Sequence, residues 1–158
     1  MELSKIRLTA AGIGLAGFIA VFGVGAAGAA PVMQVHDGTS VSTGTNPCGQ
    51  TGTTMATYHL VFKVSPPDTT GIFHYLFNEN GTVTFVPTAG LTFTGTFHEM
   101  NTANGPALTP GGTISFVETA TGKLSDGTHA SLQVHEHMTY TPDGTLTANF
   151  DNTGCVSG

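Results

Sequence analysis

Two glutamates in the second half of the chain stand where strand alternation predicts apolar side chains. A three-residue loop at Ser125-Asp126-Gly127 between two predicted strands pairs Phe116 with Glu136. The same register places Glu118 on that apolar face. A carboxyl group among apolar side chains must be paired, hydrogen-bonded or protonated. Glu118 and Glu136 are therefore predicted to meet the polar end of a ligand or to act as an acid and base pair, unless they reach water or a bulge turns them outward.

A second hairpin extends this face. A three-residue loop at Pro142-Asp143-Gly144 pairs Tyr140 with Leu146 and Glu136 with Phe150. Both hairpins then agree on which side of the sheet is buried. The predicted ligand-binding residues on this side are Glu118, Glu136, Phe116, Phe150 and Tyr140.

Two histidines lie on the opposite face of the same strand. His135 and His137 are two residues apart and so project together, and the loop above sets His135 opposite Asp151. With one further ligand they would form a metal site. Histidines on an exposed strand face are also common, and His135 beside Asp151 would then be a pH-sensitive surface charge. The sequence indicates no cofactor.

The two cysteines, Cys48 and Cys155, are the only ones in the chain. In an exported protein an even pair with no third thiol is most simply one disulfide, because the compartment is oxidising. The bridge would close nearly the whole domain.

The first 30 residues indicate export. Lys5 and Arg7 precede an almost uncharged run that ends in the small residues Ala27-Gly28-Ala29-Ala30, the pattern of a helical signal peptide over residues 1–29. The run is also long enough to span a bilayer, so a retained anchor is the alternative. The predicted location is secreted, or extracellular.

The rest of the chain is acidic and poor in charge. After cleavage two lysines face nine acidic residues, a formal net charge of 2 − 9 = −7. This balance argues against nucleic acid and against an anionic membrane surface as partners. Stable membrane insertion after cleavage is not expected. Contact with the cell wall and a small apolar or amphipathic ligand remain as partners.

The predicted fold is all-β. After a polar N-terminal arm at 30–54, alternating segments and turn residues indicate one antiparallel domain at 55–158. An open meander leaves an unpaired strand at each edge, and proteins remove these edges by closing the sheet or by folding it into two layers. We therefore expect a small β-barrel, with a two-sheet sandwich as the alternative. Eight phenylalanines would supply most of the core: Phe62, Phe73, Phe77, Phe85, Phe93, Phe97, Phe116 and Phe150. The predicted strands cover 55–64, 71–78, 82–87, 91–100, 113–121, 129–140 and 145–151, with a short one at 32–36.

Two predicted connections interrupt these strands. Glu79-Asn80-Gly81 has the composition of a hairpin turn, with Gly in the left-handed region. Asn101–Gly112, with its two prolines, is predicted to be the longest loop and a candidate lid.

The arrangement of these short motifs resembles a group of small exported bacterial hypothetical proteins with an Asn-Pro-Cys start, histidine-bearing strands and a final Cys. The resemblance implies export and a Cys48–Cys155 bridge, and it brings no activity and no catalytic residues; residues 88–112 have no counterpart. The motifs that carry it are Asn46-Pro47-Cys48, Gly71, Phe73-His74, Phe77-Asn78, Val134-His135-Glu136-His137, Asp143-Gly144, Asp151-Asn152 and Cys155.

Three functions remain open from the sequence. The leading hypothesis is a secreted, disulfide-closed barrel that binds a small, partly apolar ligand. The second is a structural or adhesive surface module without a pocket. The third is a small isomerase or hydrolase that uses the interior carboxylates. Nothing in the sequence requires an enzyme.

Overall fold

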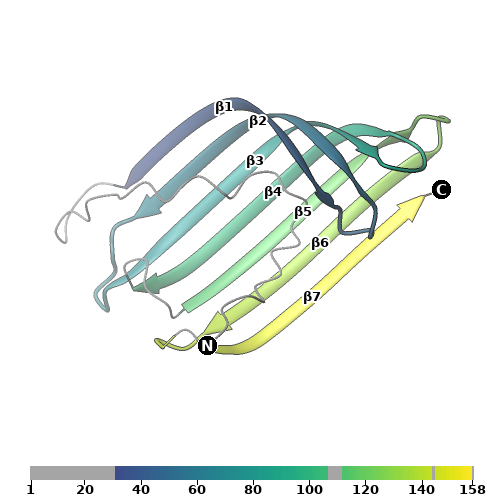
Figure 1. Ribbon diagram of the computed structural model, residues 1–158. Helices are drawn as coiled ribbons and strands as arrows, with labels where there is room; N and C mark the ends of the chain where they lie inside the picture. The colour runs from purple at the N-terminus through teal and green to yellow at the C-terminus, as the bar shows by residue number, and fades with distance from the viewer. Residues whose placement is uncertain (1–30, 107–111, 144, 158) are drawn as a thin grey trace.

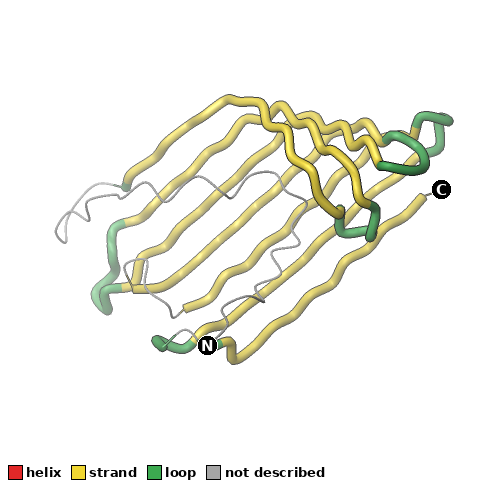
Figure 2. Tube along the Cα trace, viewed as in Figure 1, coloured by secondary structure: helices red, strands yellow, loops and turns green. Residues whose placement is uncertain are grey.

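The computed structural model describes residues 31–106, 112–143 and 145–157. These residues form an antiparallel meander of seven strands in one sheet, with neighbours in sequence order and no helix (Figures 1 and 2). The predicted signal peptide lies outside them. The strands are β1 (Val32–Thr45), β2 (Thr51–Ser65), β3 (Ile72–Pro87), β4 (Phe93–Pro106), β5 (Gly112–Leu124), β6 (His129–Tyr140) and β7 (Leu146–Ser157).

Within the described ranges, no helix is long and apolar enough to cross a membrane.

The sheet is strongly curved and its two faces differ. Figure 1 shows β1 and β2 arching over toward β7, so that one face is concave. Paired residues on adjacent strands share a face, and the register places the buried side chains together on the concave one. The buried apolar side chains are Ala56, Leu60, Val83, Phe85, Phe97, Phe116, Ala120 and Val134.

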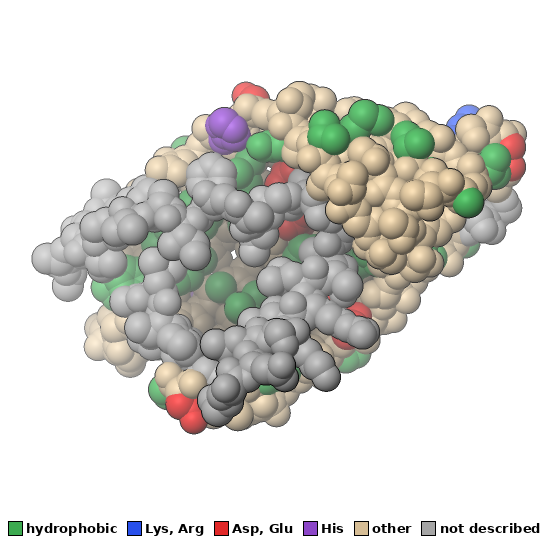
Figure 3. All heavy atoms as spheres, viewed as in Figure 1, with side chains coloured by type: hydrophobic (Ala, Val, Ile, Leu, Met, Phe, Trp, Pro, Cys, Tyr) green, Lys and Arg blue, Asp and Glu red, His purple; other side chains and the backbone are tan. Residues whose placement is uncertain are grey.

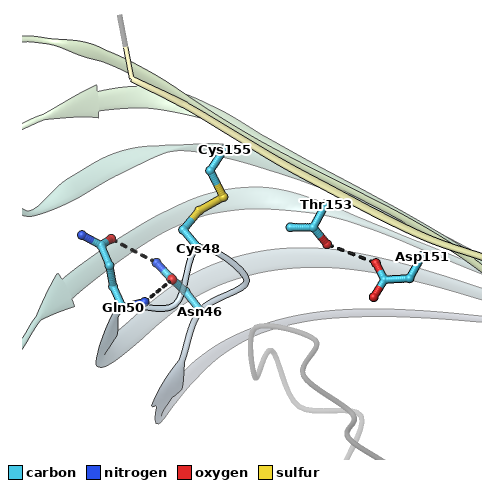
Figure 4. Close-up of a disulfide and its surroundings, with 6 residues drawn as sticks. All are labelled: Asn46, Cys48, Gln50, Asp151, Thr153 and Cys155. Carbon is cyan, nitrogen blue, oxygen red and sulfur yellow. Dashed lines mark hydrogen bonds between the residues drawn. A yellow bond between two sulfur atoms is a disulfide. The ribbon is translucent and has the colours of Figure 1, made fainter.

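The predicted barrel is wrong, because the sheet stays open. Its order runs from β1 to β7, and these two edge strands do not pair with each other. Instead, Cys48 in the β1–β2 turn bonds to Cys155 on β7, with 5.9 Å between their Cα atoms (Figure 4). The bridge joins opposite edges of the sheet at one end only. Polar residues along β7, such as Asn149 and Asn152, suit an edge that faces water.

The first hairpin is longer than expected. The predicted short strand at 32–36 is a 14-residue strand, β1, and the polar segment that follows it continues into β2. Its turn is held by Asn46, whose side-chain oxygen accepts a hydrogen bond of 2.9 Å from the Gln50 amide (Figure 4). This turn presents Cys48 to β7.

The turn predicted at Glu79-Asn80-Gly81 does not exist. Residues 72–87 form one 16-residue strand, β3, which runs straight through Asn80 and Gly81. Gly81 is needed here for close approach, because a Cβ at this position would lie 1.9 Å from the carbonyl oxygen of Thr57 on β2. The Asn-Gly pair therefore serves strand packing and not a reversal.

The predicted loop at Asn101–Gly112 is also shorter. Residues 101–106 belong to β4, and Gly112 begins β5. The remaining residues of that loop, 107–111, lie outside the described part of the chain. The predicted role of this loop as a lid therefore stays a prediction.

The β5–β6 hairpin matches its prediction. Phe116 faces Glu136 and Glu118 faces Val134, and Gly127 in the connecting turn has a φ of 89°. The left-handed conformation that only Gly adopts at little cost thus sets this register.

The β6–β7 hairpin departs from its prediction after one pair. Tyr140 faces Leu146 as expected, but an irregularity between Thr139 and Tyr140 shifts the register by one residue. Glu136 therefore faces Asp151 and not Phe150. A one-residue shift reverses the face of every later side chain, so Phe150 points to the convex face and is 52% exposed.

Candidate functional site

Three glutamates form a continuous row across the middle of the concave face. Glu79 on β3 pairs with Glu99 on β4, and Glu99 pairs with Glu118 on β5. Their exposed fractions are 4%, 5% and 3%. We call these three residues the carboxyl row. No other charged residue in the described ranges is as deeply buried.

Alternation along each strand brings the carboxyl row to this face. Each glutamate lies two residues from a phenylalanine on its own strand, so both side chains project inward together. The phenylalanines are Phe77 on β3, Phe97 on β4 and Phe116 on β5. The row thus belongs to the same inward-facing pattern that builds the core.

An apolar cluster closes one side of the row. Ala56, Val83, Phe97 and Ala120 pack together as buried residues, with Tyr58, Phe93 and Leu132 against them. Leu132 pairs with Cys155, so this cluster lies at the end of the sheet where the disulfide joins its edges. The carboxyl row borders the cluster on the side away from the bridge.

Half-buried side chains line the opposite side of the row. Hydrophobic and acidic side-chain atoms of the concave face are visible in Figure 3. The aromatic and methionine side chains on this side of the row are half-buried, with the exception of Phe116 at 8%. They are Phe62, Phe73, Tyr75, Phe77, Phe116, Met138 and Tyr140.

The carboxyl row has few hydrogen bonds. The Nδ2 of Asn101 donates to the Oε1 of Glu99 at 2.7 Å. The Oε1 of Glu79 and the Oε2 of Glu118 are buried without a hydrogen-bond partner. An unsatisfied buried oxygen costs roughly 1–3 kcal/mol, more when it is charged.

Burial makes these carboxyl groups weak acids. Desolvation raises the pKa of Glu79 to about 7. Desolvation, with repulsion from Glu118 and Glu79, raises the pKa of Glu99 to about 8, although the hydrogen bond from Asn101 opposes this. Desolvation and repulsion from Glu79 raise the pKa of Glu118 to about 7. At neutral pH the row is therefore partly protonated and carries only part of its negative charge.

Four of the predicted ligand-binding residues lie on the concave face. Glu118 and Phe116 are buried there, while Glu136 and Tyr140 are half-buried farther toward the open side. Burial, with repulsion from Asp151, raises the pKa of Glu136. The hydroxyl of Tyr140 donates to the Sδ of Met138 at 3.3 Å. The fifth, Phe150, lies on the convex face because of the shifted register.

The two predicted metal-ligating histidines share the convex face. The Nδ1 of His137 lies 2.7 Å from the Oγ of Ser115, and the ring of His135 meets Phe150 edge-on at 5.5 Å. His135 faces Asn152 and not Asp151, which belongs to the other face. In the described part of the chain, no group of three or more His, Cys, Asp or Glu residues is arranged to hold a metal ion.

Glu79 and Glu99 were missed in the sequence for different reasons. Glu79 lies in the segment whose composition predicts a turn, and that segment is in fact part of β3. Glu99 stands two residues from Phe97, so strand alternation alone could have placed it on the apolar face. The three glutamates become neighbours only through the register of β3, β4 and β5. The sequence of β3 contains no turn from which that register could be derived.

Comparisons with protein-family models, curated proteins and solved structures found no match. The chemistry of the site must therefore be argued from its own residues. A row of weakly acidic, partly unpaired carboxyl groups beside an accessible aromatic surface can hold a ligand that has both a polar and an apolar part.

Proposed function

We propose that the chain is an exported binding protein whose concave face takes a small, partly apolar ligand. The half-buried aromatic side chains hold the apolar part, and the carboxyl row meets the polar end. The disulfide supports the exported location, since such bonds persist in oxidising compartments. No catalytic step is needed to account for these features.

One observation carries this proposal: the carboxyl row is buried and only partly hydrogen-bonded. Glu79 and Glu118 each keep an oxygen without a partner, and the aromatic surface beside them is not fully packed. Buried polar groups are nearly always paired in folded proteins. A ligand on the concave face would supply hydrogen-bond donors to these oxygens.

A neutral fluorescent probe tests whether the concave face binds apolar molecules. N-phenyl-1-naphthylamine becomes bright in apolar surroundings and carries no charge. We expect saturable binding to the full-length protein, weakened several-fold by Phe77→Ser. The matched control is Met100→Ser, on the convex face of the neighbouring strand, where Met100 is 37% exposed. This control should bind the probe as the unmodified protein does.

Two results would contradict the proposal. The first is the absence of saturable probe binding by the folded, disulfide-bonded protein. The second is an equal loss of binding in the Phe77→Ser and Met100→Ser variants, which would place the probe elsewhere or show general unfolding.

The convex face favours a second candidate, a surface module that contacts polymers or other proteins. Apolar side chains are exposed there on both edge strands, including Val35 and Val41 on β1 and Phe150 and Val156 on β7. They are spread among polar residues and do not form one patch, so we rank this function second. Binding of cell-wall polymers that Phe150→Ser abolishes and Phe77→Ser leaves intact would favour it.

A further inference from the structure

We propose that the polar end of the ligand is an organic ammonium group, held by the carboxyl row of Glu79, Glu99 and Glu118. This inference depends on the proposed binding function, because it names the chemistry of the ligand at the same site. It requires that the row lack an internal counterion, that its oxygens lack hydrogen-bond donors, and that its surroundings suit a cation.

Among the described residues, no lysine or arginine shares the face of the carboxyl row. The described residues include two lysines, Lys63 and Lys123, and no arginine. Lys63 pairs with Leu76, and Lys123 pairs with Thr94 and His129. These positions alternate away from the carboxyl row, so both lysines belong to the convex face. No lysine or arginine in the described part of the chain can neutralise the row.

The unpartnered oxygens accept hydrogen bonds and need donors. They are at the two ends of the row, on Glu79 and Glu118, while Asn101 already donates to Glu99 in the middle. An ammonium group offers up to three N–H donors and a positive charge. Adjacent strands are about 4.8 Å apart, so one ammonium can bridge two neighbouring carboxylates. The charge-assisted bonds formed would be about twice as strong as neutral ones.

A bare metal ion fits this row less well. The described residues contain no group of three or more suitable side chains placed to hold one. The same strand spacing separates the backbones of the two outer glutamates by about 10 Å, whereas the oxygen ligands of one Ca²⁺ or Mg²⁺ ion all lie within about 2.6 Å of it. An organic cation does not require such convergence.

The neighbouring side chains also suit a cation with an apolar body. Phe77, Phe97 and Phe116 are each two residues from a glutamate of the row and face the same way. Aromatic faces attract ammonium groups by about 0.5–2 kcal/mol. The half-buried aromatic side chains beyond them would cover the hydrocarbon part of the ligand.

The bound state should depend on pH through the row. Above about pH 8 all three carboxyl groups ionise and attract a cation, whereas mild acid protonates them and releases it. Other titratable groups face the same side: His36 on β1, Tyr58 on β2, Tyr75 on β3, Glu136 and Tyr140 on β6, and Asp151 on β7. Glu136 and Asp151 lie toward the open side and add carboxyl groups to the same face.

Three octyl compounds of equal chain length separate charge from hydrophobicity. We would titrate the full-length protein with n-octylammonium, n-octanol and octanoate by calorimetry at about pH 8.5, where an alkylamine is still protonated. We expect octylammonium to bind at least about tenfold more tightly than octanol and octanoate to bind least. At neutral pH octylammonium binding should release protons, measured by the dependence of its heat on the buffer, because the bound cation lowers the pKa values of the row.

Two variants and a control identify the binding groups. Glu118→Gln and Glu79→Gln should each reduce octylammonium affinity about tenfold or more and leave octanol affinity nearly unchanged. Asp37→Asn, on the convex face of β1, should leave octylammonium affinity nearly unchanged. Thermal melting checks that each variant is folded, and the glutamine variants should melt no lower than the unmodified protein at this pH.

The possible results distinguish the two proposals. Equal affinity for octanol and octylammonium, or octylammonium binding that is insensitive to both glutamine variants, would overturn the ammonium site and leave the binding function standing. Tighter binding of octanoate than of octylammonium would do the same. No binding of any octyl compound, together with no binding of the neutral naphthylamine probe, would overturn the binding function itself.

Discussion

Glu99 and Glu118 face each other directly across β4 and β5, and both carboxyl groups are almost completely buried. Two negative charges on directly paired residues repel strongly when water is excluded. The pair therefore keeps protons at a pH where exposed glutamates have lost them, which makes the stability of the domain depend on pH.

We expect the protein to become less stable as the pH rises from about 5 to about 8. The folded pKa values of the carboxyl row lie near 7 to 8, above the usual 4.5. The folded state thus binds more protons than the unfolded state across this range, and the free energy of unfolding falls with pH. Below about pH 4.5 this contribution is fully present. Thermal melting measured every half unit of pH would show the decline.

Glu99→Gln tests whether the carboxyl row causes this pH dependence. Glutamine keeps the size and hydrogen-bonding capacity of the side chain but cannot ionise. We expect it to raise the free energy of unfolding by roughly 2 kcal/mol at pH 8.5 and to change it little at pH 5. Asp37→Asn, on the convex face of β1 where Asp37 is 79% exposed, is the control. A decline that persists unchanged in Glu99→Gln would assign the pH dependence to other groups.

Gly81 should be one of the least replaceable residues in the sheet. The Cβ of an alanine there would lie 1.9 Å from the Thr57 carbonyl oxygen, so the β2–β3 backbone must move apart. We expect Gly81→Ala to lower the free energy of unfolding by more than about 2 kcal/mol in urea titrations. Gly44→Ala, where the added Cβ meets nothing within 4 Å, should change it by less than about 0.5 kcal/mol. Similar values for both variants would contradict the long, uninterrupted β3.

The disulfide should contribute much of the stability of the open sheet. Cys48 and Cys155 are 107 residues apart, and closing so long a loop restricts the unfolded chain by about 4 to 5 kcal/mol in the chain-entropy model. We expect the double variant Cys48→Ala and Cys155→Ala to unfold at a much lower urea concentration. The mass of the unreduced native protein should be two hydrogens below that of the free dithiol. A double variant as stable as the unmodified protein would show that the edges are held without the bridge.

The sequence predicted which face of the sheet a side chain occupies more reliably than it predicted where the turns fall. Alternation placed Phe116 and Glu118 correctly, because the left-handed glycine at Gly127 sets the β5–β6 register. The same logic misplaced Gly81, since a glycine required for close strand packing and a glycine required for a turn look alike in sequence. The absence of pairing between the edge strands β1 and β7 could not be predicted either. Whether a sheet closes depends on the accumulated curvature of all its strands.

The shifted register of β7 predicts contrasting effects for two phenylalanines. Phe116 is 8% exposed on the concave face, whereas Phe150 is 52% exposed on the convex face. We expect Phe116→Ala to cost roughly 3 kcal/mol or more in urea unfolding, the usual result of emptying a buried aromatic position. Phe150→Ala should cost less than about 1 kcal/mol, since it loses mainly the edge contact with His135. If both variants were strongly destabilised, Phe150 would belong to the core and the unshifted register, with Glu136 opposite Phe150, would be the correct one.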